Sequence, residues 1–278
     1  MAFRAAGLRR IRRVRVIRRH TRLWWRCVLN ALARETEYRA NAFATVAEGA
    51  AQVALAVVTF LVVYQFTPSI GGWTRSQALI LVGIYRIAEG LINMQVAPNM
   101  VAIGGAIRRG DMDYVLLRPV SSQFLVSART LALSECANVA IGLGITAYAV
   151  HAADVGWSVG GLLQATVLLL CGVMLLYAVW FAIMTCSFWL VQVNNLDVLF
   201  FAVFEAARYP VAYFSSAIRA LLTFVVPVAF ATTFPVEALL GRADVRLIPL
   251  GLGLTAIALV LTHLFWNVAV RSYSSASS

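Results

Sequence analysis

The fold is decided by the stretch Asn41–Phe66, which reads NAFATVAEGAAQVALAVVTFLVVYQF. A helix needs about 20 predominantly apolar residues to cross the hydrocarbon of a bilayer, and this stretch is long enough. Twelve of the 23 basic residues of the chain lie in its first 39 positions, directly before this stretch. Because Arg is retained on the cytoplasmic side of a membrane, we expect a lipid-embedded helical protein with a cytoplasmic N-terminus.

Composition indicates the same class. The 278 residues are 61% hydrophobic and 13% charged, whereas soluble domains carry about 25% charged residues. The net charge of +11 does not indicate a nucleic-acid surface, because most of the excess lies in one tail and the rest mainly in short loops. Every basic residue is Arg. A phosphate-binding P-loop needs a Lys, so we expect no Walker-type ATPase in this chain.

The cysteines and histidines show no pattern of a metal site. No CxxC, HExxH or mixed cluster occurs, so we expect no metal and free thiols that pack as small apolar groups. The cysteines are Cys27, Cys136, Cys171 and Cys186.

The first 40 residues divide into two segments. Residues 1–20 are a basic arm, either laid on anionic headgroups or solvated. Residues 21–40 predict an amphipathic helix at the membrane interface, since Trp25, Leu29 and Leu32 share one face. An uncleaved signal-anchor fits better than a cleaved secretory signal, because the basic region is too long and the apolar core is of full spanning length. A mitochondrial presequence is the main rival, although this segment lacks the expected Ser.

Four further apolar runs are long enough to cross a bilayer: Ser76–Val96, Phe124–Val150, Val159–Val191 and Leu247–Val270. Between the last two lies Asn194–Glu237, which is apolar but broken by three prolines. We expect an all-α membrane domain over residues 41–271 with six crossings, and a cytoplasmic tail at 272–278. The charges alone favour Ala217–Val236 as the fifth span.

The loop after the second run is the most informative internal segment. Residues 106–123 read AIRRGDMDYVLLRPVSSQ, in which charged and apolar side chains interleave until Pro119. This pattern predicts a short amphipathic helix on the cytoplasmic face that docks into a groove of a soluble partner. Gly104 and Gly105, just before it, predict a turn.

Three parts of the chain resemble ABC-2 type exporter permeases, specifically the small branch in which two related permeases pair with one type of ATPase. The loop resembles the family's G-x-L-D…LLRPVS segment at Gly110, Asp111, Asp113, Leu116, Leu117, Arg118, Pro119, Val120 and Ser121. A later segment is similar at Tyr209, Pro210, Arg219, Pro227, Pro235, Glu237 and Gly241. The ending Tyr273–Ala276 is similar to the family's C-terminal Y-x-S-A.

The resemblance implies the six-span fold of the type V exporters in a bacterial plasma membrane. It implies an elbow helix with Trp24, Trp25 and Arg26, and a re-entrant segment at Ser215–Pro235 after a short rising span. The loop 104–121 would be the coupling loop that contacts a cytosolic ATPase dimer, and ATP and Mg²⁺ would be bound by that dimer. Its coupling residues would be Ile107, Arg108, Arg109, Gly110, Asp111, Asp113, Leu116, Leu117, Arg118 and Pro119.

Ionisable groups inside the runs are the remaining site residues. Arg86 and Glu89 are one helical turn apart and can pair. With Asn93, Pro227 and Pro235 they would line a translocation path, or the pair would be only a neutralised ion pair within one helix. Other polar residues of the runs, including Glu48, Gln52, Glu135 and Asn138, carry the same two interpretations.

We therefore expect the permease subunit of an ATP-driven exporter, with a second permease as partner, for a lipophilic or cationic small molecule. Two alternatives stay open. One is a lipid or glycan flippase of the same architecture. The other is a carrier or scaffold that works without an ATPase, which is disfavoured because no relay of acidic or His residues runs through the spans.

Overall fold

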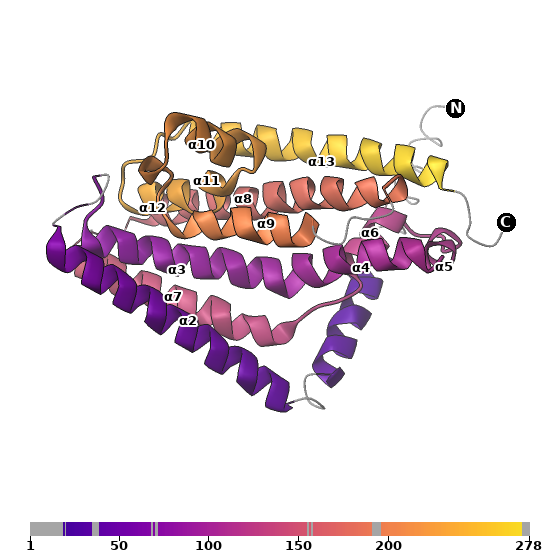
Figure 1. Ribbon diagram of the computed structural model, residues 1–278, viewed down its shortest axis with the longest axis horizontal. Helices are drawn as coiled ribbons and strands as arrows, with labels where there is room; N and C mark the ends of the chain where they lie inside the picture. The colour runs from indigo at the N-terminus through magenta and orange to yellow at the C-terminus, as the bar shows by residue number, and fades with distance from the viewer. Residues whose placement is uncertain are drawn as a thin grey trace, which may run out of the picture.

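The computed structural model describes residues 19, 21–34, 39–67, 69, 72–154, 156, 158–190 and 196–273, and every regular element among them is helical. The long helices lie roughly side by side along the longest axis of the molecule (Figure 1). In chain order after the helix of residues 21–34, the elements are α2 (Arg39–Phe66), α3 (Arg75–Leu91), the π-helical turn η1 (Ile92–Val96), α4 (Ala97–Arg108), α5 (Met112–Leu116), α6 (Ser122–Ala128), η2 (Leu133–Glu135), α7 (Cys136–Ala152), α8 (Val159–Thr185), η3 (Cys186–Phe188), α9 (Leu196–Glu205), η4 (Ala206–Arg208), η5 (Val211–Tyr213), α10 (Ser216–Ala220), η6 (Leu221–Val225), α11 (Val228–Ala231), α12 (Thr233–Leu239) and α13 (Leu247–Ser272).

Five continuous helices are long and apolar enough to cross a membrane, which confirms a multi-pass helical protein. They cover Phe43–Phe66, Arg75–Arg108, Leu133–Ala152, Val159–Phe188 and Leu247–Ser272. The second helix is longer than the apolar run Ser76–Val96 that predicted it, because α4 continues the helix beyond η1. The expected turn at Gly104 and Gly105 is therefore wrong. Gly104 is instead buried in α4. A Cβ added there would lie 3.6 Å from Met184 Cε and from Ser187 Oγ.

The third apolar run is interrupted, which its sequence did not indicate. The expected span Phe124–Val150 divides into α6 and α7, and residues 129–132 between them are not helical. The break is tolerated because backbone groups there find other partners: the N–H of Ala132 donates to Met94 O at 2.9 Å, and the N–H of Thr130 donates to Asn99 Oδ1 at 2.9 Å.

The bundle has two ends (Figure 1). The α5 end carries α5 and the last turn of α13. The α12 end carries α12, the last turn of α2 and the first turn of α3. The side chain of Gln164 in α8 donates to Asp244 O at 3.0 Å, so α8 and α13 both begin at the α12 end.

Residues 216–239 form a bent pair of helical segments. Ser216–Val225 and Val228–Leu239 meet at an angle of 72°. Pro227 lies at the break, where it lacks the N–H that a continuous helix would use. The fifth span that the charges favoured over Ala217–Val236 is therefore not one straight helix, and the bent pair is either a broken span or a re-entrant segment.

Both flanks of this bent pair are attached to the same end of the bundle. Before the pair, the Tyr213 hydroxyl lies 3.0 Å from the hydroxyl of Tyr64, in the last turn of α2. After the pair, Arg242 Nη1 donates to Gln77 Oε1 at 3.5 Å, in the first turn of α3. The chain thus leaves and returns at the α12 end.

Aromatic stacking holds α9 against α8 and α3. Phe200 stacks on Trp180 with ring centroids 4.3 Å apart, and Phe204 stacks on Tyr85 at 5.3 Å. Trp180 and Phe204 are almost completely buried. This packing brings the end of α9, and Arg208 in η4 after it, beside the middle of α3.

Candidate functional site

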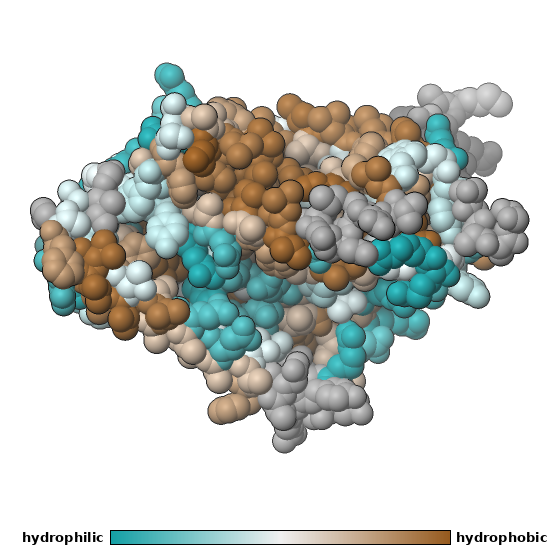
Figure 2. All heavy atoms as spheres, viewed as in Figure 1, coloured by the Kyte–Doolittle hydropathy of each residue, from teal (hydrophilic) through white to brown (hydrophobic). Residues whose placement is uncertain are grey.

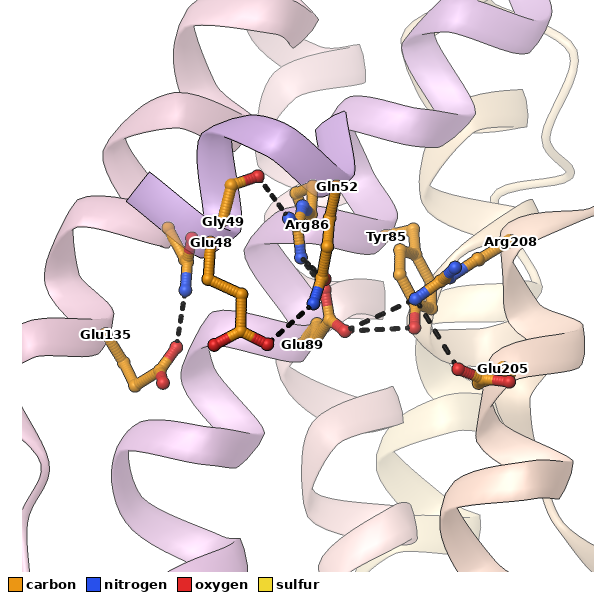
Figure 3. Close-up of polar contacts among 10 residues, drawn as sticks. Glu48, Gly49, Gln52, Tyr85, Arg86, Glu89, Glu135, Glu205 and Arg208 are labelled. Atoms are coloured by element: carbon orange, nitrogen blue, oxygen red, sulfur yellow. Dashed lines mark hydrogen bonds and ion pairs between the residues drawn. The ribbon is translucent and has the colours of Figure 1, made fainter. Parts of the chain in front are cut away.

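The predicted pair of Arg86 and Glu89 is confirmed, and it lies at the centre of a larger polar cluster (Figure 3). Arg86 is only 4% exposed. Its guanidinium donates to Glu89 Oε2, to Gln52 Oε1 at 3.2 Å and to Gly49 O at 2.6 Å. Because the last two acceptors lie on α2, this arginine joins α2 to α3 as well as pairing within α3.

A second guanidinium reaches the same carboxylate from η4. Arg208 Nη2 lies 3.9 Å from Glu89 Oε1 and 3.6 Å from Glu205 Oε1. The Arg208 guanidinium also lies over the Tyr85 ring, 5.2 Å from its centroid, and the Tyr85 hydroxyl donates to Glu89 Oε1 at 3.2 Å. Glu89 is therefore shared by two arginines and a tyrosine from two separate parts of the chain (Figure 3).

The other side of the cluster is formed by α2 and the start of α7. Gln52 Nε2 donates to Glu48 Oε1 at 3.1 Å, and Asn138 Nδ2 donates to Glu135 Oε2 at 2.7 Å. Asn138 packs directly on Gly49, where an added Cβ would lie 2.0 Å from Asn138 Oδ1. The α2 helix can approach α7 this closely because Gly49 has no side chain.

The cluster holds more negative than positive charge and opens on one face of the molecule. Its four carboxyl groups belong to Glu48, Glu89, Glu135 and Glu205, and its two guanidinium groups to Arg86 and Arg208. Glu48 and Gln52 are exposed, and the Glu205 side chain is 64% exposed. In the view of Figure 2, hydrophilic residues lie between two hydrophobic areas of the surface.

The other residues predicted for a path lie elsewhere. Asn93 is half-buried in η1, one turn beyond Glu89. Pro227 lies at the bend of the bent pair and Pro235 is buried in α12. The sequence did not indicate that Arg208 would join Arg86 and Glu89, because no local spacing relates η4 to α3.

The loop predicted to contact a partner is largely helical but differently divided. Ile107 and Arg108 form the last turn of α4, and the separate helix α5 covers only Met112–Leu116. Gly110 turns the chain between them with φ +75°, a conformation that favours glycine. The expected single amphipathic helix from Ile107 to Arg118 is thus wrong, because this turn interrupts it.

α5 has one face in the bundle and one face in solvent. Met112 is fully buried and Val115 is 8% exposed, whereas Tyr114 and Leu117 are 73% and 82% exposed. Arg109 Nε donates to Asp111 Oδ2 at 2.9 Å, which braces the turn. Amphipathicity is therefore confirmed for α5 itself, with the exposed apolar side chains at its tip.

The C-terminal end of α13 packs beside α5. The Tyr273 ring contacts Phe188 edge-to-face at 5.7 Å, and Phe188 contacts Trp266 in the same way at 5.4 Å. Burial and the neighbouring carboxylate of Asp113 raise the pKa of Tyr273. Its hydroxyl therefore stays protonated throughout the physiological range.

The amphipathic segment near the N-terminus is helical over residues 21–34, and residues 35–38 lie outside the described part of the chain. Ala31 is buried, whereas Trp24, Trp25 and Leu29 are 44%, 57% and 47% exposed. The helix thus uses the Ala31 side against the protein and leaves its tryptophans free for a lipid interface, as expected of side chains with an apolar body and a polar N–H. Arg26 is also exposed.

One comparison with known proteins identifies a relationship. The family model described as ABC-2 family transporter protein matches residues 50–277. No curated protein and no solved structure matches the chain.

Proposed function

Because this family model covers most of its length, the chain belongs to the ABC-2 transporter family, and we propose that it is the permease subunit of an ATP-driven exporter. A separate cytosolic ATPase dimer binds ATP and Mg²⁺ and hydrolyses the nucleotide, while this chain provides the path and the moving part. A second permease, either a related chain or a copy of this one, completes the path. The cargo is a lipophilic or cationic small molecule, such as an antibiotic, and it moves outward.

The observation that carries this proposal is the polar cluster at membrane depth. Arg86 lies eleven residues into α3, which is about 16 Å along the helix at 1.5 Å per residue, near the middle of a hydrocarbon layer of about 30 Å. A charge at that depth costs about 2.5–3.5 kcal/mol and usually faces protein or water. Lipid cannot cover the exposed Glu48 and Glu205 at low cost, so this face forms one wall of a wet path and the second permease forms the other.

The proposed topology has six crossings, with α9 as a short fifth one and the bent pair re-entering from the outer side. Attachment of both flanks of the pair to the α12 end supports re-entry. The Arg-rich first 39 residues, and Arg108, Arg109 and Arg118 near α5, favour the α5 end as the cytoplasmic one. Both termini are then cytoplasmic, in a bacterial plasma membrane.

In this arrangement α5 is the coupling helix. Its buried residues Met112 and Val115 anchor it to the bundle, and its exposed Tyr114 and Leu117 provide an apolar contact for the ATPase. Arg108, Arg109, Asp111 and Asp113 surround that contact and set its register. The same division between apolar anchors and a charged rim is typical of helices that dock into a partner's groove.

The test uses charge reversal at the α5 end. The tagged chain is purified from membranes in mild detergent and reconstituted in proteoliposomes, where ATP-dependent movement of ethidium, a lipophilic cation, is measured. Reversal of Arg108, Arg109, Asp111 and Asp113 should reduce both retained ATPase activity and ethidium transport by at least about tenfold, because several interface charges are inverted together. Reversal of the exposed Arg75 and Arg246 at the α12 end is the matched control and should change neither.

Three outcomes would contradict the proposal. ATPase binding and transport that survive the α5 reversal would remove α5 as the coupling helix. ATP-dependent movement of a fluorescent lipid without movement of ethidium would favour the flippase. Transport by a purified chain that retains no ATPase would favour the carrier.

A further inference from the structure

Two neighbouring passes of the chain are interrupted side by side. The first interruption is η1, a single π-helical turn between α3 and α4. The second is the non-helical segment of residues 129–132 between α6 and α7. The N–H of Ala132 donates to Met94 O at 2.9 Å, so the second interruption is bonded directly to the first.

The side chain of Asn99 connects the two interruptions. Asn99 is 1% exposed. Its Nδ2 donates to Gln95 O at 2.6 Å and to Thr130 O at 2.7 Å, and its Oδ1 accepts from the N–H of Thr130 at 2.9 Å. One buried amide thus satisfies backbone groups of both passes that regular helix would have paired internally.

A second amide lies beside it. Gln95 Nε2 donates to Ser127 O at 2.9 Å, near the end of α6. Together, Gln95 and Asn99 bond three carbonyl or N–H groups of residues 127–130 to one turn of the opposite pass. No helical hydrogen bonds cross residues 129–132 in the second pass. In the first pass the helix continues through a π-helical turn, which is a common place for a helix to kink.

The two segments on the α12 side of this level pack closely against each other. Toward the α12 end, α3 and α7 are in backbone contact: a Cβ on Gly83 would lie 2.7 Å from Thr146 N, and one on Gly142 would lie 2.8 Å from Ile87 N. Toward the α5 end, α4 and α6 form a hairpin whose connection contains α5 (Figure 1). A rigid pair of helices therefore joins a hairpin that bears the proposed coupling helix.

The polar cluster begins directly at this level. Glu89 lies in the last turn of α3, just before η1, and Glu135 ends η2, just after residues 129–132. Asn138, the partner of Glu135, lies in the first turn of α7. Glu89 and Glu135 both lie on the α12 side of this level, directly next to it, so a tilt of α4 and α6 against α3 and α7 would act first on these two carboxylates.

We propose that η1 and residues 129–132 form a double hinge that Asn99 holds in register, and that movement of α5 acts through this hinge on the polar cluster. Asn99 is a positioning residue in this mechanism, since it touches neither cargo nor nucleotide. The inference rests on the proposed function, because it takes α5 as the place where the ATPase applies force. Beyond the proposed function, the inference names the place where this force bends the permease and the residues that the force displaces.

Spin-label distances test the hinge without altering it. In a complex whose four native cysteines are replaced, one label pair spans the hinge at positions Val101, which is 48% exposed in α4, and Leu143, and a second pair at Arg75 and Leu143 lies on one side of it. Between the nucleotide-free and vanadate-trapped states, the first distance should shift by at least about 2 Å and the second should stay the same. A fixed Val101–Leu143 distance in a complex that transports ethidium would overturn the hinge.

Substitution of Asn99 tests its positioning role. Asn99→Leu should leave ATP hydrolysis in place and lower the ethidium moved per ATP by about tenfold, because force at α5 no longer reaches the cluster in register. Asn99→Gln keeps an amide that can donate and accept at this position, so it should show a smaller loss and serves if the Leu variant does not fold. Asn267→Leu, at a position whose amide bonds the His263 ring, is the matched control and should behave as wild type.

The outcomes separate this inference from the proposed function. If the wild-type complex shows no ATP-driven transport, the proposed function fails. If wild type transports, and both Asn99 variants move as much ethidium per ATP as Asn267→Leu, the role of Asn99 is wrong.

Discussion

Arg86 joins two helices through one guanidinium, so its removal should lower the free energy of unfolding of the whole bundle. Among the described residues, Arg86→Leu leaves Glu89 with Arg208 as its one cationic partner, at 3.9 Å, and it removes the side-chain donor to Gly49 O. Removing one partner of a buried ion pair destabilises by about 3–5 kcal/mol. We expect a clear drop in the midpoint of thermal unfolding of the purified chain in detergent.

Arg271→Leu is the control for Arg86→Leu, because Arg271 is an exposed arginine in the last turn of α13. Its loss should leave the unfolding midpoint nearly unchanged, since exposed charges contribute about 0–1 kcal/mol. Equal midpoints for the two variants would show that the cluster does not hold α2 to α3.

At the scale of single residues, sequence reasoning could predict only local pairs. Arg86 and Glu89 are three positions apart, and helical geometry alone places them together. Arg208 comes from η4, and its place beside Glu89 depends on the stacking of α9 on Trp180 and Tyr85. The carbonyl of Gly49 could not be predicted either, because any residue supplies a carbonyl and only the packing shows which one is reached.

At the scale of elements, the contact of α3 with α7 depends on glycines, and a matched pair of variants can test it. A Cβ on Gly142 would lie 2.8 Å from Gly83 O and from Ile87 N, which are backbone atoms that cannot turn aside, whereas one on Gly144 would meet nothing within 4 Å. Gly142→Ala should destabilise by about 1–3 kcal/mol through overpacking. Gly144→Ala should be neutral or stabilise by up to about 1 kcal/mol, because Ala favours helix.

The measurement for both glycine variants is the thermal unfolding midpoint in detergent, with resistance of α7 to proteolysis as a second readout. If Gly142→Ala and Gly144→Ala give the same midpoint, close approach of α3 and α7 does not contribute to stability.

Long helices could be predicted from apolar runs, but their ends and breaks could not. The run Ser76–Val96 predicted a helix that ends at Val96, but the helix extends to Arg108. Gly104, which suggested a turn, stays helical because it packs against Met184 and Ser187. The run Phe124–Val150 gave no sign of its break. That break depends on Asn99, which is distant in sequence and supplies hydrogen bonds that helix would otherwise have made.

At the scale of the whole molecule, composition and charge placement were sufficient to predict the structural class of the protein. Hydrophobic residues at 61% and an Arg-rich N-terminus predict a multi-pass helical protein, and five continuous helices of spanning length agree with it. The path of the chain between α8 and α13 required the structure. Charges at Arg208 and Arg219 suggested one topology, whereas the anchors at Tyr213 and Arg242 support another.

Accessibility of single cysteines decides between these topologies. In a variant whose native cysteines are replaced by Ser, Arg219→Cys and Val159→Cys should both react with a membrane-impermeant maleimide on intact cells. Arg271→Cys, at an exposed position in the last turn of α13 at the α5 end, should react only after permeabilisation. This result follows from physical linkage: Tyr213 and Arg242 tie both flanks of residues 216–239 to the end where α8 begins. Labelling at position 219 only from the cytoplasm, with position 159 outside, would require the bent pair to cross the membrane and would remove α9 as a crossing.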